Sequence, residues 1–279
     1  MLNNNGIVLS ITSPKHGIGG KTVLTAAIGF MMADIIKEEV LITDHNYRFT
    51  DMNTYLGVVA SKTLDDVLNL AEAGKLDKQI FKIHTTNIFK NVNILPGSIT
   101  SLENNLEKKV NKINNFLDCS KAAFEVTMVD CNATDASNKS LYTRNLLKKS
   151  DVVIVALEQD ALCVDRYLKS NLAKLKNKII VINKYDDIKI QLNIDAIKKL
   201  IGKEETIFTL PISYRLKNST NSYSLSDYLL NDSDAYIAGV RNICKYIATQ
   251  YEYIKQDNIP VDEEVKGKKQ FMFSLPWKR

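Results

Sequence analysis

Seven short apolar runs alternate with longer segments of helical periodicity along most of the chain. These runs span residues 6–12, 39–44, 92–95, 124–130, 151–157, 178–183 and 206–210. They are apolar without strict alternation, which is typical of strands buried on both faces. Such strands, separated by helices, predict a doubly wound α/β fold: a mostly parallel sheet of about seven strands with helices on both faces.

The segments between these runs carry the helical signals. Residues 21–36 are mostly apolar and predict a buried helix. Residues 61–73 predict a capped helix, and an apolar repeat over residues 102–117 predicts another. The last helix is expected to be long, with one apolar stripe over residues 236–254.

The 279-residue chain has no internal repeat and no linker before about residue 257. We therefore predict one domain over residues 1–256 and a tail over residues 257–279, polar at first and then basic and aromatic. Hydrophobic residues make up 45% of the chain and charged residues 25%. That balance supports a sizeable core and excludes a disordered chain and a disulfide-dense mini-domain.

The formal net charge of +5 makes the chain mildly basic. This charge permits weak attraction to nucleic acid or to an anionic membrane but requires neither. The four cysteines include no C-x-x-C pair, and the apolar runs are far shorter than the about 20 residues of a membrane-spanning helix. We expect a reduced, cytoplasmic protein, with peripheral attachment at the inner face of the membrane left open.

A glycine-rich loop lies between the first apolar run and the first helix. Glycines allow backbone N–H groups to surround phosphate oxygens, and the helix N-terminus adds partial positive charge. In such a loop Lys21 reaches the outer phosphates and the Thr22 hydroxyl binds Mg²⁺. Strand, loop and helix together predict a phosphate-binding site; the alternative is a glycine turn without a nucleotide. The candidate nucleotide-binding residues are Lys15, His16, Gly17, Ile18, Gly19, Gly20, Lys21, Thr22 and Val23.

The loop departs from the common G-x-x-x-x-G-K-[ST] pattern, because Lys15 stands where the first glycine is expected. A lysine near the start of the loop resembles the deviant loop of the ParA/MinD superfamily of ATPases. The resemblance implies ATP and Mg²⁺ as cofactors and a nucleotide-dependent homodimer, in which the family's first lysine crosses between subunits. Counted back from Lys21, that lysine position is His16. Either the loop is one residue longer here or the intersubunit lysine is lost.

Two further strand ends resemble that superfamily. Asp44 matches the first acidic residue of the family's D-x-D, which lies near Mg²⁺ and its waters. Asn46 replaces the second, which positions the attacking water; an amide cannot accept a proton from water, so ATPase activity is expected to be weak or absent. Asp130 ends a strand that resembles Walker B, and Asp135 follows as a switch-region carboxylate or a helix cap. The residues implied as catalytic are Lys21, Asp44 and Asn46, and those around the metal are Thr22, Asp44 and Asp130.

The residues after the sixth run allow two interpretations of the base. Asn183 stands where ParA/MinD relatives contact adenine, and Lys184 follows it. Residues 183–186 also spell N-K-x-D, the motif with which GTPases bind guanine through the aspartate, here Asp186. The resemblance in the loop and the second strand favours ATP. Pro211 is expected to begin the other wall of the base site.

Residues 47–57 resemble a stretch of the CpaE/TadZ branch, and residues 61–68 and 94–97 follow in the order of that branch, which localises pilus and secretion machinery. The resemblance implies a positioning or assembly factor with a protein partner, serving a pilus, secretion, conjugation or partition apparatus. The basic and aromatic residues 266–279 are expected to dock on the body or on a partner, with a membrane surface as the weaker alternative. Basic pairs at residues 108–109 and 198–199 are expected to be solvated helix faces, with non-specific DNA binding as the weaker alternative. Two other functions stay open, a non-hydrolysing structural adaptor and a GTPase.

Overall fold

The computed structural model describes residues 6–17, 19–46, 50–98, 110–134, 140–186 and 192–253. An eight-stranded sheet crosses these residues in the order β3-β4-β2-β5-β1-β6-β7-β8. Neighbouring strands are parallel except for β3 and β4, so the predicted doubly wound α/β fold is confirmed. The strands are β1 (Ile7–Thr12), β2 (Val40–His45), β3 (Thr86–Phe89), β4 (Val92–Leu95), β5 (Val126–Cys131), β6 (Val152–Glu158), β7 (Lys178–Tyr185) and β8 (Ile207–Pro211).

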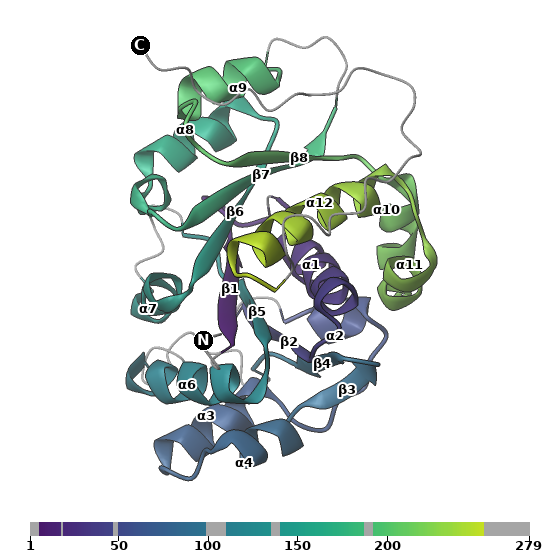
Figure 1. Cartoon of the computed structure of the whole chain (residues 1–279). Helices are drawn as coiled ribbons and strands as arrows, with labels where there is room; N and C mark the ends of the chain where they lie inside the picture. Colours follow the sequence, from purple (N-terminus) through teal and green to yellow (C-terminus); the bar gives the residue numbers. More distant parts are fainter. Residues whose placement is uncertain are drawn as a thin grey trace.

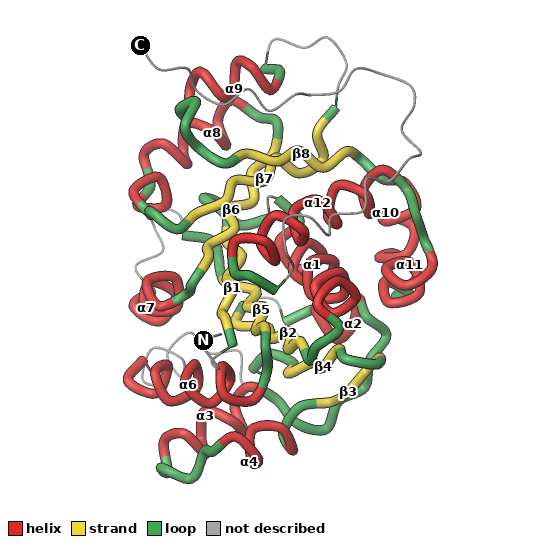
Figure 2. Tube along the Cα trace, in the orientation of Figure 1, coloured by secondary structure: helices red, strands yellow, loops and turns green. Residues whose placement is uncertain are grey.

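Helices cover both faces of the sheet (Figures 1 and 2). One face carries α1 (Lys21–Ile36), α2 (Met52–Tyr55), α10 (Tyr214–Asn221), α11 (Leu225–Asn231) and α12 (Ala235–Gln250). The other carries α3 (Leu64–Glu72), α4 (Lys78–Ile83), α6 (Ile113–Ala123), α7 (Leu141–Lys149), α8 (Ala161–Lys169) and α9 (Ile194–Ile201), with two short 3₁₀ helices at Val110–Lys112 and Asn171–Lys174. Each layer of helices closes its own hydrophobic core against the sheet.

Side chains of the central strand β1 alternate between the two cores. Leu9 and Ile11 belong to the core under α1 and α12, whereas Val8 belongs to the core on the other face. Because both cores are apolar, the sequence of the strand shows no alternation. Helix α1 occupies the bounds predicted for it, and it is apolar on nearly all sides because it lies between the sheet and α12.

The eighth strand, β3, is the part of the described sheet that the sequence pattern does not predict, so the expected count of about seven is corrected to eight. β3 has four residues and is only half-buried. It lies at the edge of the sheet and runs antiparallel to β4, to which it is joined by a turn in which Lys90 has a φ of 35°. A short edge strand of this kind has no need of the continuous apolar run that marks a buried strand.

Two tyrosines anchor the end of the described chain at the amino-terminal edge of the sheet. After α12, the Tyr251 hydroxyl donates to the Asp151 carbonyl at 3.0 Å, and the Tyr253 hydroxyl donates to the Glu125 carbonyl at 2.9 Å. Asp151 directly precedes β6, and Glu125 directly precedes β5. The tail predicted from residue 257 and most of the apolar repeat before residue 110 lie outside the described residues. No described helix combines the length and apolarity needed to cross a bilayer.

Candidate functional site

The glycine-rich loop joins the carboxyl end of β1 to α1 at the centre of the sheet. Gly17, Gly19 and Gly20 have positive φ angles of 71°, 80° and 56°. Gly19 is also confined by β6, because a Cβ at this position would lie 2.9 Å from Ala156 Cβ and 3.0 Å from the Ala156 carbonyl oxygen. The loop therefore needs glycine at position 19 for its backbone conformation and for space.

Two carboxylates stand beside this loop on neighbouring strands. Asp44 of β2 and Asp130 of β5 are directly in register, and both are fully buried. The Thr22 hydroxyl, in the first turn of α1, donates to Asp130 Oδ2 at 2.5 Å. Asp44 accepts hydrogen bonds from the backbone N–H groups of Asn46 at 2.8 Å and of Met52 at 3.4 Å. The fold thus brings the start of α1 and the ends of β2 and β5 into one cluster.

Burial controls the charge of the two carboxyl groups. It raises the pKa of Asp130 to about 6, although the Lys21 ammonium and the Thr22 hydrogen bond lower it. Burial, and next the charge of Asp130, raise the pKa of Asp44 well above its ordinary value. Asp130 Oδ1 is buried and has no hydrogen-bond partner within the described part of the chain. A buried carboxylate oxygen without a donor, next to a hydroxyl and a second carboxylate, fits the oxygen environment that Mg²⁺ prefers.

Side chains from β6 and β7 hold the loop from its other side. Asn183 Nδ2 donates to the Gly19 carbonyl at 2.8 Å, and the Gly19 N–H donates to Glu158 Oε1 at 3.3 Å. The Lys184 ammonium pairs with the same Glu158 oxygen at 2.7 Å. Glu158 is absent from the residues predicted from the sequence. The sequence signal that could have indicated Glu158 is its charge at the end of an otherwise apolar strand. Its contact with the loop arises because β6 lies directly beside β1.

Neither a protein-family model nor a curated protein matches the sequence. Solved structures match it well. A ParA family ATPase from Chlorobium tepidum superposes with a TM-score of 0.72 at 17% identity, over 88% of this chain and 100% of that one. The septum site-determining protein MinD from Pyrococcus horikoshii, complexed with Mg-ADP, gives a TM-score of 0.69 at 18% identity, over 90% and 99% of the two chains. A variant of Cyanothece McdA in complex with ATP gives 0.66 at 15% identity, over 90% and 98%. The chain has the ParA/MinD fold.

The remaining loop candidates take different positions in this ParA/MinD fold. Lys15 is exposed and His16 is half-buried, at the start of the loop. Val23 is half-buried and packs against the core under α1. Ile18 and Asp135 lie outside the described residues.

The base-site candidates gather at the same edge of the sheet as the loop. Pro211 is in register with Tyr185, so the carboxyl ends of β7 and β8 are level. Asn183 is buried with its amide on the loop, and Lys184 has a positive φ of 56°. The backbone of Asp186 is fixed by Gln159, which accepts from its N–H at 2.9 Å and donates to its carbonyl at 3.1 Å.

His45 follows Asp44 but lies on the opposite face of the sheet. Its ring contacts Phe116 edge-on, and its Nδ1 is 2.8 Å from the Tyr142 hydroxyl of α7. Burial lowers the pKa of His45 to about 3, so the imidazole is neutral at physiological pH. His45 therefore ties the end of β2 to α7 and offers no charge to a phosphate.

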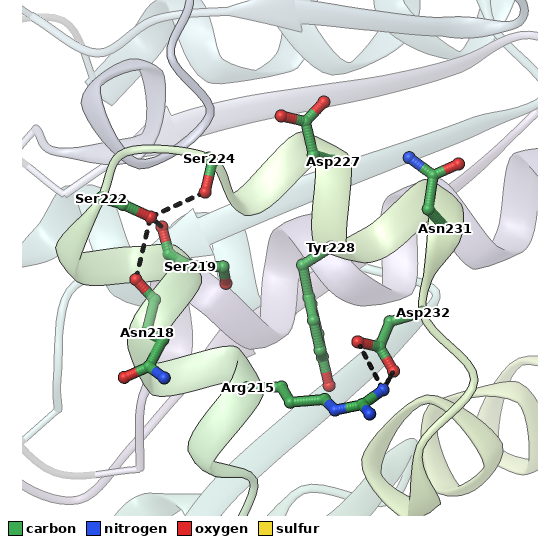
Figure 3. A pocket seen from close by; sticks show the side chains of 9 residues that line it. All are labelled: Arg215, Asn218, Ser219, Ser222, Ser224, Asp227, Tyr228, Asn231 and Asp232. Atoms are coloured by element: carbon green, nitrogen blue, oxygen red, sulfur yellow. Dashed lines mark hydrogen bonds and ion pairs between the residues drawn. The ribbon is translucent and has the colours of Figure 1, made fainter.

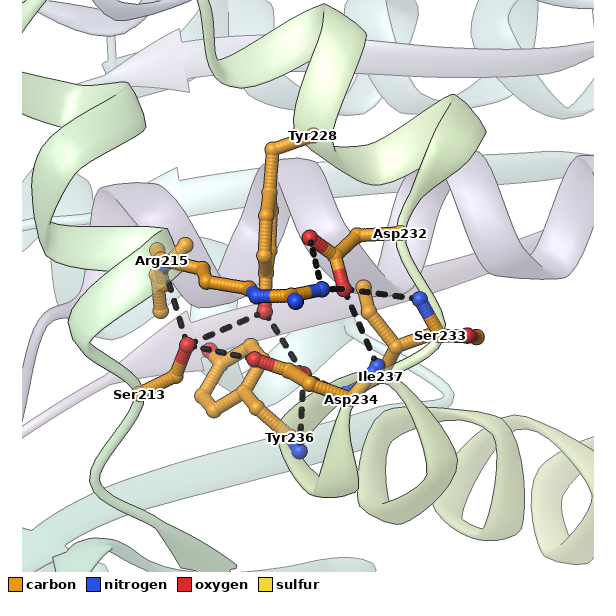
Figure 4. A network of polar contacts seen from close by, with 9 residues as sticks. Ser213, Arg215, Tyr228, Asp232, Ser233, Asp234, Tyr236 and Ile237 are labelled. Atoms are coloured by element: carbon orange, nitrogen blue, oxygen red, sulfur yellow. Dashed lines mark hydrogen bonds and ion pairs between the residues drawn. The ribbon is translucent and has the colours of Figure 1, made fainter.

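A hollow of about 430 Å³ lies apart from the loop, between α10 and α11 (Figure 3). Within it Arg215 pairs with Asp232 at 3.1 Å, and the Ser222 and Ser224 hydroxyls are hydrogen-bonded at 2.8 Å. Behind it, Asp234 caps α12 and accepts from the Ser213 hydroxyl at 2.6 Å and the Tyr228 hydroxyl at 2.9 Å (Figure 4). These contacts join the three helices after β8, which is a structural role.

We predict that Asp130→Asn makes the metal-free chain more stable. The amide keeps an oxygen acceptor for Thr22 and removes a buried charge that also raises the pKa of Asp44. The free energy of unfolding is expected to rise by about 1–3 kcal/mol in urea titrations with a chelator at pH 8. Because the wild-type carboxyl takes up a proton as the pH falls through about 6, the gain should shrink below that pH.

The control for this prediction is Asp165→Asn, which removes an exposed carboxylate paired with Lys169 on α8. That variant should change the unfolding free energy by less than about 0.5 kcal/mol. A loss of stability in Asp130→Asn would show that neighbouring groups already compensate the buried charge.

Proposed function

We propose that the chain binds ATP with Mg²⁺ at the glycine-rich loop and acts as a nucleotide-dependent positioning or assembly factor. The observation that carries this proposal is the cluster in which Thr22 bonds to Asp130 beside the buried Lys21. Lys21 and the loop N–H groups would hold the phosphates, and Thr22 would bind the metal, with Asp44 and Asp130 accepting from its waters. Bound Mg²⁺ would supply positive charge that offsets the phosphates and the two carboxylates.

Hydrolysis is proposed to be slow or absent. Asn46 stands where the ParA/MinD superfamily places a water-positioning aspartate, and its amide can orient a water but not take its proton. The Asn46 N–H donates to Asp44, which keeps this residue beside the cluster. The chain would therefore be a weak ATPase at most, with Lys21, Asp44 and Asn46 as the catalytic group.

ATP is proposed in preference to GTP, with the base between the ends of β7 and β8. Asn183, Lys184 and Pro211 lie at this edge. The alternative, a GTPase, rests on Asp186, whose backbone is fixed by Gln159 beside the same edge. Solved structures with this fold include a putative plasmid partition protein from Borrelia burgdorferi bound to AMPPNP.

We further propose a nucleotide-dependent homodimer with a protein partner in a CpaE/TadZ-like apparatus for pili, secretion, conjugation or partition. A MinC:MinD complex from Aquifex aeolicus is among the solved structures that share the fold. In this proposal, residues 1–256 form the nucleotide-binding body and residues 257–279 dock on the body or the partner. A membrane surface is the alternative for that tail, and non-specific DNA is a further alternative partner for the basic residues of the chain.

The test is calorimetric titration of the purified chain with ATP and with GTP, each with and without Mg²⁺, together with light scattering. Tight, Mg²⁺-dependent ATP binding with a doubling of mass is the expected result, and the turnover rate then separates an ATPase from a locked adaptor. A preference for GTP that Asp186→Ala removes would support the GTPase. Binding of neither nucleotide would overturn the proposal and leave a scaffold.

A further inference from the structure

A carboxylate of the chain itself occupies one of the loop's N–H groups. The Gly19 N–H donates to Glu158 Oε1 at 3.3 Å. Phosphate and carboxylate oxygens use the same backbone donors, and an N–H group donates one good hydrogen bond at a time. Glu158 therefore takes, within the chain, a donor that a bound phosphate would need.

Residues of β6 and β7 around Glu158 hold Gly19 and Glu158 in place. Ala156, two residues earlier on β6 and on the same face, forms the wall against Gly19. On β7, Asn183 holds the Gly19 carbonyl at 2.8 Å and accepts from the Lys184 N–H at 3.0 Å. Lys184 is thereby held in its positive-φ conformation, and its ammonium reaches Glu158 Oε1 at 2.7 Å. Both the N–H and the carbonyl of Gly19 are bound by the neighbouring strands.

The Glu158–Lys184 pair can also leave the loop without disturbing the core. The Glu158 side chain is 26% exposed and the Lys184 side chain is 57% exposed. A carboxylate at this edge can thus turn toward solvent, where water solvates it fully. The buried neighbours Ala156 and Asn183 would stay in place.

We propose that Glu158 is an internal competitor for phosphate, held on the Gly19 N–H by Lys184, and that phosphate binding requires its displacement. This inference rests on the proposed function, because it assigns a regulatory contact to the same loop. Glu158 would set the affinity of the loop for phosphate groups, whether these come from a nucleotide or from inorganic pyrophosphate.

The test is Glu158→Gln, which keeps the shape and the acceptor oxygen but removes the charge. We expect affinity for pyrophosphate, ADP and ATP to rise about three- to tenfold in Mg²⁺ buffer, since a repelling anion is removed. The Gly19 N–H should also exchange with solvent deuterium faster in the ligand-free variant, because its bond to an ionised acceptor is weakened. Glu205→Gln is the matched control: Glu205 pairs with Lys178 at 2.8 Å near the other end of β7, with 28% of its side chain exposed.

Equal or weaker binding by Glu158→Gln, or an equal gain in Glu205→Gln, would overturn the competitor role. Titration of the wild type with ATP tests the proposed function separately. If the wild type binds no nucleotide, the proposed function fails. In that case the competitor role is supported only if Glu158→Gln binds pyrophosphate while the wild type and Glu205→Gln do not. Any other result overturns the competitor role as well.

Discussion

Lys21→Ala is expected to abolish ATP binding without unfolding the chain. Lys21 is the first residue of α1 and is only 7% exposed, with its charge close enough to lower the pKa of Asp130. In the proposed complex its ammonium makes charge-assisted hydrogen bonds to the outer phosphates, each worth about 1.5–3 kcal/mol. Loss of two such bonds corresponds to at least about a hundredfold loss of affinity by calorimetry.

The matched control for this prediction is Lys169→Ala. Lys169 also lies on a helix and near a carboxylate, Asp165, but its side chain is 76% exposed. Its removal should leave ATP affinity unchanged, and circular dichroism should show both variants folded. ATP binding by Lys21→Ala with wild-type affinity would remove the basis of the proposed site.

The second large effect is expected from Gly19→Ala. A methyl group at this position would collide with Ala156 Cβ and with the Ala156 carbonyl, at 2.9 and 3.0 Å, while φ is +80°. The loop would have to move away from β6, which would displace the N–H groups that are proposed to bind phosphate. We expect ATP affinity to fall about a hundredfold, measured by the same titration.

The variant Gly17→Ala distinguishes the two effects of Gly19→Ala, the steric collision with β6 and the backbone strain of a positive φ. Gly17 has a φ of +71°, and nothing lies within 4 Å of a Cβ built there. Both variants meet the same penalty of about 1–2 kcal/mol for positive φ, so only Gly19→Ala adds the contact with β6. Equal losses in the two variants would show that the wall formed by Ala156 does not shape the loop.

Most of the sheet can be predicted from the sequence because its strands are buried on both faces. Continuous apolar runs mark seven of the eight described strands to within about two residues at each end. Strand β3 could not be predicted in this way, because a half-exposed strand at the edge of a sheet needs no continuous apolar run. Its place depends on pairing with β4, which the pattern of a single strand does not encode.

Only part of the candidate site could likewise be predicted from the sequence. Lys21 and Thr22 could be named because they follow the glycine-rich loop at the start of a helix, and Asp44 and Asp130 because the ends of their strands resemble the ParA/MinD superfamily. Glu158 could not, because its contact with Gly19 joins residues 139 positions apart and depends on β6 lying beside β1. The face on which a side chain lies is equally hidden: Asp44 points toward α2 and its neighbour His45 toward α7.

Tyr251 and Tyr253 give the molecule a fixed orientation for tethering. Their hydroxyls bind carbonyls just before β6 and β5, so residues 251–253 lie at the edge of the sheet opposite the loop. A fluorophore attached at residue 253 would therefore lie at the opposite edge of the sheet from the loop. A chain immobilised at residue 253 would present its loop to the solution, and successive cycles of binding and release at the proposed site could be followed on the same molecule.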